Sequence, residues 1–231
     1  MICTNIEQIR SRIRKTALGC GRDPDTVQLV AVSKRMPAEA VEAAEQCGQL
    51  LFGENYLQDA REKIQQLNPD LQWHFIGHLQ SNKAKTAAEL FQVIETVDRL
   101  KIARLLNKHA ASLNKSIDIL IQVNVGREPQ KAGILPENAP TLLKEAQSFS
   151  NLNILGLMTM PPYGKQAEES RPWFRKLKQL ADTCAEQGLF ANNNDNAVQL
   201  SMGMSGDFTV AIEEGATLVR VGTAIFGQRP D

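Results

Sequence analysis

The sequence predicts an α/β protein whose strands and helices form a single (β/α)8 barrel of the TIM type, preceded by an extra helix. Eight short apolar segments, rich in β-branched residues, alternate with amphipathic helical segments along the 231 residues. This length is typical of one such barrel. An open doubly wound sheet would need a phosphate-binding GxGxxG pattern after its first strand, and none is there.

The opening segment, residues 4–18, is expected to form the extra helix. Thr4 and Glu7 have the spacing of a capping box, and Gly19 is expected to end the helix, followed closely by Gly21. Apolar side chains recur at helical intervals at Ile6, Ile9, Ile13 and Ala17. This stripe predicts a helix that packs one face against the barrel.

The barrel is expected to occupy residues 27–228 and, with the opening helix, to make residues 1–231 one domain. We expect strands at residues 28–33, 50–53, 72–76, 92–97, 117–125, 152–158, 197–202 and 218–222. Helices are expected between them at residues 37–47, 56–66, 82–88, 99–114, 136–149, 168–187 and 207–214. The polar run at 192–196 is expected to be a solvent-exposed loop.

Composition excludes several classes of partner. Lys and Arg total 26, as do Asp and Glu, so no net charge favours nucleic acid or a membrane surface. No apolar run approaches the ~18 residues of a membrane span, and the charged N-terminus is unlike a secretory signal. We therefore expect a cytoplasmic protein. Its four cysteines lack CxxC spacing and are expected to be reduced thiols: Cys3, Cys20, Cys47 and Cys184.

Lys34 ends the first expected strand, in the run QLVAVSKR at residues 28–35. A lysine at the C-terminal end of a barrel strand extends its amine into the mouth of the barrel, where partial desolvation lowers the pKa. Such an amine can form a Schiff base with an aldehyde. The alternative, a solvated lysine that merely closes a strand, is favoured by this stretch alone.

The ends of the last two strands predict a phosphate site. The runs LSMGMSGDF and RVGTAIFG place small and hydroxyl-bearing residues on the loops after strands seven and eight, the usual phosphate position of this fold. They contribute Ser201, Gly203, Ser205, Gly222 and Thr223. Glycines let backbone amides approach a phosphate, and hydroxyl groups add donors. Tight turns between strand and helix are the alternative use of the glycines.

Arg220 lies two residues before Gly222 and therefore faces the barrel mouth or interior. Its buried charge needs an acceptor, either a carboxylate or a pyridine nitrogen. His74 and His78 are four apart, but they flank a strand end and no third ligand is evident, so we do not predict a metal site.

These segments resemble one known family in the same order along the chain. LVAVSKRMP, FGENYLQ, WHFIGHLQSNK, QVNVGREPQKAG, GLMTM, LSMGMSGDF and RVGTAIFG are similar to the pyridoxal phosphate homeostasis proteins, from about residue 27 to 228. That family has the fold-type III barrel, related to the N-terminal domain of alanine racemase. The resemblance implies that pyridoxal 5′-phosphate binds at the C-terminal mouth.

Carried over by position, the resemblance implies that Lys34 forms the Schiff base with pyridoxal phosphate. Ser201, Gly222 and Thr223 would bind the phosphate, together with Ser205. Arg220 would contact the pyridine nitrogen, and Asn55 would approach the phenolic oxygen of the ring.

The expected function is to hold pyridoxal phosphate and to regulate or deliver it, with effects on amino-acid metabolism. Apo-enzymes that need pyridoxal phosphate are the expected recipients, and the resemblance suggests a monomer. An arginine cannot give the pyridine nitrogen a proton, and about nine residues follow the eighth strand, which argues against a second catalytic domain.

Two alternatives stay open. One is an amino-acid racemase or related enzyme that uses Tyr56, His78 or Ser205 as a second acid or base. The other is a partner-binding protein that senses pyridoxal phosphate.

Overall fold

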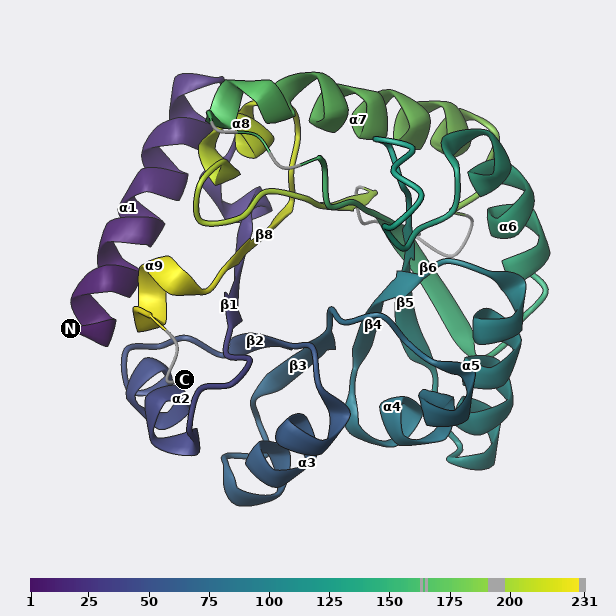
Figure 1. Ribbon diagram of the computed structural model, residues 1–231, viewed down its shortest axis with the longest axis horizontal. Helices are drawn as coiled ribbons and strands as arrows, with labels where there is room; N and C mark the ends of the chain where they lie inside the picture. Colours follow the sequence, from purple (N-terminus) through teal and green to yellow (C-terminus); the bar gives the residue numbers. More distant parts are fainter. Residues whose placement is uncertain (163, 165, 191–197, 229–231) are drawn as a thin grey trace.

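A closed parallel barrel forms the centre of the protein. The computed structural model describes residues 1–162, 164, 166–190 and 198–228. Its strands follow one another around the ring in chain order, and β1 (Gln28–Val32) pairs with β8 (Leu218–Val221) to close it. Helices surround the strands on the outside (Figure 1). The predicted (β/α)8 barrel is confirmed.

Each predicted strand overlaps an observed one. Besides β1 and β8, the observed strands are β2 (Leu51–Glu54), β3 (Gln72–Phe75), β4 (Val93–Val97), β5 (Ile117–Gln122), β6 (Leu152–Met158) and β7 (Gln199–Ser201). β5 ends earlier than predicted because the backbone beyond Gln122 also bonds to its own following loop, where the Asn124 amide donates to the carbonyl of Ile134 at 2.8 Å. Residue 197, the predicted start of β7, lies outside the described residues, as do residues 192–196 of the predicted polar loop.

The helices are α1 (Ile2–Gly19), α2 (Ala38–Glu45), α3 (Leu57–Gln66), α4 (Ala84–Leu90), α5 (Leu100–Ser112), α6 (Ala139–Ala146), α7 (Arg171–Glu186), α8 (Phe208–Glu213) and α9 (Thr223–Phe226). Short 3-10 turns lie at Pro24–Thr26, Ser81–Lys83, Pro136–Asn138 and Ala167–Ser170. The predicted helices are confirmed. The sequence did not predict α9, because a helix of four residues is too short to show a periodic pattern.

The extra helix α1 lies along one side of the barrel, next to α8 and α9 (Figure 1). Its predicted apolar stripe is buried at Ile6, Ile9, Ile13 and Ala17. The Asn5 side chain donates to the carbonyl of Ile225 in α9 at 2.8 Å. The predicted capping box is wrong, because the helix already begins at Ile2 and Thr4 lies within its first turn. α1 thus covers the short helix that follows β8.

Apolar side chains fill the barrel in two separate layers. A small cluster inside the ring is formed by Val30, Leu51, Leu120, Met158 and Leu218. The larger cluster lies between the strands and the surrounding helices and includes Leu29, Ala31 and Trp73. Because Leu218 and Arg220 are two residues apart in β8, Arg220 also points inward, one layer nearer the mouth. Among the described helices, none is long and apolar enough to cross a bilayer.

The expectation of four reduced cysteines is wrong for two of them. Cys3 and Cys47 form a disulfide, with 5.3 Å between their Cα atoms, whereas Cys20 and Cys184 are free. The first turn of α1 lies beside the chain that leaves α2, which brings together two cysteines 44 positions apart. Spacing along the sequence does not reveal this proximity.

We expect the disulfide to stabilise the fold, since closing a loop of this length removes about 4 kcal/mol of unfolded-chain entropy in the simplest model. Cys3→Ser should lower the free energy of unfolding by about 2–4 kcal/mol under non-reducing conditions. Cys20→Ser, at an exposed free thiol, is the control and should have no such effect. Alkylation of the denatured, unreduced protein should modify two cysteines; modification of all four would contradict the pairing.

Candidate functional site

The predicted site residues come from the C-terminal ends of four neighbouring strands. Lys34 follows β1, Asn55 follows β2, Ser201 ends β7 and Arg220 lies in β8. The others follow β7 or β8, and they are Ser205, Gly222 and Thr223. Because β7, β8, β1 and β2 are consecutive in the ring, the structure brings all of these residues to one sector of the barrel mouth.

At two glycines the loops of this sector pack closely against their neighbours, and at Gly203 no room is left for a side chain. A Cβ on Gly203, whose φ is +91°, would lie 2.5 Å from the Cβ of Ala211. A Cβ on Gly222 would lie 3.1 Å from the carbonyl oxygen of Val32. The loop after β8 therefore packs directly against the end of β1, two residues before Lys34.

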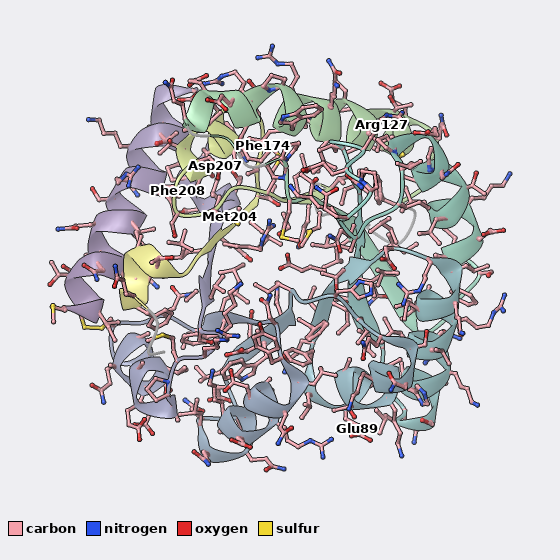
Figure 2. All side chains as sticks on the ribbon, viewed as in Figure 1. Glu89, Arg127, Phe174, Met204, Asp207 and Phe208 are labelled. Atoms are coloured by element: carbon pink, nitrogen blue, oxygen red, sulfur yellow. A yellow bond between two sulfur atoms is a disulfide. The ribbon has the colours of Figure 1, made fainter. Side chains whose placement is uncertain are left out.

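Asp207 holds the loop after β7. Its carboxylate accepts a hydrogen bond from the Met204 amide at 2.7 Å and another from the hydroxyl of Ser170 at 2.8 Å. Figure 2 shows Met204 and Asp207 close together where this loop meets α8. Ser205 lies within the braced loop and is half-buried. Thr223, by contrast, is exposed at the start of α9.

A buried lysine holds the backbone before Lys34. The amine of Lys63 in α3 is 4% exposed, and it donates to the carbonyl of Ser33 at 2.8 Å and to the carboxylate of Glu54 at 2.7 Å. The Ser33 hydroxyl donates to the same Glu54 oxygen at 2.7 Å. The end of β1 is therefore tied to β2 and α3 through one ionic group. Lys34 itself is half-buried.

Asp59 holds the backbone after Lys34. Its carboxylate accepts from the backbone amide of Arg35 and from the Lys63 amine, both at 3.1 Å. Arg35 has a φ of +60°, in the left-handed region that a non-glycine residue adopts only when its surroundings fix it. The residues on both sides of Lys34 are thus held by the same group of charges.

Glu54 is the electrostatically unusual member of this group. Burial raises the pKa of Glu54, and the charge and hydrogen bond of Lys63 offset only part of that increase. Among the described residues, Glu54 Oε2 and Asn55 Oδ1 are buried and have no hydrogen-bond partner. Unsatisfied polar atoms of this kind mark a place where a ligand or water completes the bonding.

Arg220 is paired with a carboxylate across the barrel. One terminal nitrogen donates to the hydroxyl of Ser201 at 2.5 Å and lies 3.9 Å from Glu95 Oε2, and the other donates to the carbonyl of Thr159 at 2.8 Å. The Ser201 hydroxyl in turn donates to Glu95 Oε2 at 2.5 Å. Of the two acceptors expected for Arg220, the carboxylate is present within the protein.

His74 completes this group of buried side chains. Its Nδ1 lies 2.7 Å from Glu95 Oε1. Burial alone would raise the pKa of Glu95, but the hydrogen bond and charge of His74, together with the charge of Arg220, lower it. Burial lowers the pKa of Arg220, and the charges of Glu95 and Asp207 oppose that shift. We name these four side chains, His74, Glu95, Ser201 and Arg220, the cross-barrel network.

Several of these residues were not predicted from the sequence. His74 was considered only as a metal ligand, and His78 lies apart from it, half exposed, 3.8 Å from Asp98. Glu95 could have been noticed as a charged residue inside the apolar strand VIETV. Lys63 could have been noticed because it follows buried Ala60 by three positions on the inner face of α3.

A cavity of about 570 Å³ lies beside the loop after β7. It is lined by residues that follow β5, β6 and β7, among them Lys131, Met160, Met204 and Asp207. Gln122 also lines it, and its buried Oε1 has no partner among the described residues. Among the described residues that line the cavity, none is a predicted cofactor-binding residue.

Comparison with known proteins identifies the class of barrel. Residues 4–230 match the family model described as alanine racemase, N-terminal domain. The barrel is therefore of the alanine racemase N-terminal type. Within that class, the chain belongs to the family of pyridoxal phosphate homeostasis proteins, as the next comparisons show.

Relatives of that name match almost the whole chain. The pyridoxal phosphate homeostasis protein of Vibrio alginolyticus is 45% identical over 97% of this chain and 96% of its own length. That of Aquifex aeolicus is 41% identical over 98% of both. The structure of PipY from Synechococcus elongatus with PLP bound is similar, with a TM-score of 0.85, 36% identity and coverage of 98% of this chain and 100% of PipY.

We expect Lys63→Met to destabilise the protein by about 3–5 kcal/mol, because it leaves the carboxylate of Glu54 buried without its ion pair. Lys63→Met combined with Glu54→Gln should recover part of that loss, since no charge is then buried at position 54 and only the part-exposed carboxylate of Asp59 remains. Denaturant unfolding of the three proteins measures this coupling. Lys85→Met, at an exposed lysine of α4, is the matched control. Strictly additive effects of the two substitutions would contradict the pairing.

We expect Glu95 to make the fold sensitive to acid. Its pKa is lowered in the folded state, so the unfolded chain takes up a proton at higher pH than the folded protein does. The stability from this group is therefore complete above about pH 4.3, the ordinary glutamate pKa, and is lost as the pH falls through the lowered value. The difference in unfolding free energy between the native protein and Glu95→Gln should narrow over that range. A difference independent of pH would contradict the assignment.

Proposed function

We propose that the protein holds pyridoxal 5′-phosphate as a Schiff base on Lys34 and regulates or delivers this cofactor. The observation that carries the proposal is the match over nearly the full length to relatives named pyridoxal phosphate homeostasis proteins, together with a PLP-bound structure of the same fold. The effect on the cell would be on vitamin B6 levels and, through them, on amino-acid metabolism.

The residues at the barrel mouth fit this cofactor. Pyridoxal phosphate supplies an aldehyde that condenses with amines. The Lys34 amine is the nucleophile, and Lys63 and Asp59 keep its strand end in place. Asn55 lies one strand away, and its side-chain oxygen has no partner among the described residues; its amide would meet the phenolic oxygen after rotating its nitrogen inward.

The loops after β7 and β8 would bind the phosphate. Close packing of Gly222 against β1 keeps that loop beside Lys34, and Thr223 and Ser205 supply hydroxyl groups. Ser201 stays in the proposed set, but its hydroxyl proton already points to Glu95. We infer that Ser201 contributes chiefly through its place at the strand end, between Arg220 and the phosphate loop.

Arg220 favours storage over catalysis. Its guanidinium stays protonated, so it can donate a hydrogen bond to the pyridine nitrogen but cannot transfer a proton to it. A ring that is not protonated is a poor acceptor of electrons from a carbanion.

We further propose that residues 1–231 work as one domain, as a monomer in the cytoplasm, and that apo-enzymes requiring pyridoxal phosphate receive the cofactor. The relatives named above match this chain over nearly their whole length, which supports the proposal that the chain works as one domain.

The experiment is to load the protein with pyridoxal phosphate, reduce it with borohydride and map the labelled peptide. We expect a visible absorption band, one reduced adduct on Lys34 and loss of that adduct in Lys34→Ala. Lys85→Ala is the control at an exposed lysine and should label as the native protein does. A colourless protein, or labelling that persists elsewhere in the native chain, would contradict the proposal.

The loaded protein should also restore activity to an apo-enzyme that needs pyridoxal phosphate, at a rate that depends on the amount of loaded protein. A screen of L- and D-amino acids tests the alternative function. Racemisation that Lys34→Ala abolishes would establish a racemase in place of a carrier.

A further inference from the structure

We propose that Glu95, oriented by His74, is the positioning residue that fixes Arg220 and Ser201 and sets the charge felt at the ring end of the cofactor site. This inference deepens the proposed function, because it rests on Arg220 as the partner of the pyridine nitrogen. Neither Glu95 nor His74 would touch the cofactor; both would act through Arg220.

The four residues of the cross-barrel network come from opposite sides of the barrel. His74 and Glu95 lie in β3 and β4, whereas Ser201 and Arg220 lie in β7 and β8, four strands away around the ring. Glu95 and Ser201 are fully buried, Arg220 is 3% exposed and His74 is 6% exposed. The cross-barrel network therefore forms a polar layer inside the ring, beneath the mouth.

The hydrogen-bond donors and acceptors allow one arrangement of the protons. A carboxylate only accepts, so the Ser201 hydroxyl donates to Glu95 Oε2 and accepts from Arg220. His74 Nδ1 must carry the proton directed at Glu95 Oε1. Both carboxylate oxygens of Glu95 are thus used, and each fixes the orientation of a different neighbour.

The guanidinium of Arg220 is held in place by only part of its N–H groups. Of its five N–H groups, one is committed to Ser201 and one to the carbonyl of Thr159. These two bonds fix the plane of the group, and the hydrogen bonds between described residues leave further N–H groups for an acceptor at the mouth. Glu95 also balances the positive charge of Arg220, which is otherwise costly inside a protein.

Stability alone does not account for such a network. Apolar side chains of similar volume are often as stabilising as a buried ion pair, and the layer below, around Val30 and Leu218, is apolar. An ionic layer next to the mouth is better explained by the need to hold a charged group in one orientation.

The test compares variants that keep or remove two features of the cross-barrel network: the negative charge of Glu95 and the hydrogen bond that His74 donates to it. Glu95→Gln removes the balancing charge. His74→Leu removes the donor to Glu95, whereas His74→Asn is the conservative variant that keeps a donor. Glu214→Gln is the control, because it removes an ion-paired carboxylate from the outer helices, where Glu214 contacts Arg171 and Arg175.

The first measurement uses the protein without cofactor. In isotope-labelled native protein, NMR should detect His74 with its proton on Nδ1 and a slowly exchanging Arg220 N–H signal. Glu95→Gln should shift the His74 signal and speed exchange at Arg220, and Glu214→Gln should leave both unchanged. Unchanged signals in Glu95→Gln would overturn the inference.

The second measurement adds pyridoxal phosphate and follows the visible absorption band against pH. Without Glu95, the positive potential near the cofactor rises, so a positively charged nitrogen there loses its proton more readily. We expect the midpoint in Glu95→Gln to fall by about one pH unit, to fall less in His74→Leu, and to stay unchanged in His74→Asn and Glu214→Gln.

The outcomes separate this inference from the proposed function. If the native protein gives no visible band, the proposed function fails, whereas the cofactor-free NMR measurement still reports on the network. If it loads normally and Glu95→Gln keeps the native midpoint, the positioning role fails. Should Glu95→Gln not fold, the contrast between His74→Leu and His74→Asn decides, and equal midpoints in these two variants would overturn the inference.

Discussion

Pairing between the first and last strands is the interaction on which the rest of the structure depends. β1 and β8 run side by side from Gln28 opposite Leu218 to Ala31 opposite Val221. This pairing closes the ring and aligns the loop at Gly222 with the end of β1. A lysine early in the chain and the predicted phosphate loop near its C-terminus become neighbours only because the barrel closes in this register.

Two groups of buried charges then fix the mouth from different directions. Lys63, Glu54 and Asp59 act on the backbone around Lys34, from α3 and β2. Glu95 and His74 act on the side chain of Arg220, from the far side of the ring. One group places the amine that would bind an aldehyde, and the other places the cation that would meet the ring. Both consist of opposite charges in contact, which limits the penalty of burial.

Much of the fold can be predicted from the sequence because strands and helices are indicated by short, local patterns of residues. Runs such as LVAV at residues 29–32 are β-branched and apolar, and the strands they form end where small or polar residues begin. Lys34 stood out because a lysine at the end of a barrel strand extends its amine into the mouth, and Arg220 because a charge that faces the barrel interior needs an acceptor. Their role toward a cofactor stays a prediction, whereas the barrel and its strand order are confirmed.

The partners of those residues could not be predicted in the same way. Contact between Glu95 and Arg220 depends on the tilt and register of strands on opposite sides of the ring, which no short segment encodes. The contact of Cys3 with Cys47 depends on how α1 lies against α2. The position of Lys63 three residues after Ala60 indicates the inner face of α3, but its partners Ser33 and Glu54 come from other elements and are known only from the packing of the fold.

The Cys3–Cys47 bond makes a covalent ring of the first part of the chain. That ring contains most of α1, all of β1 and Lys34. A protease that cut the exposed turn at Asp23–Asp25 would therefore leave the helix attached to the barrel through sulfur. The two pieces of the cut segment would thus stay covalently joined, as in a circular chain that is opened once, for as long as the two sulfur atoms stay bonded.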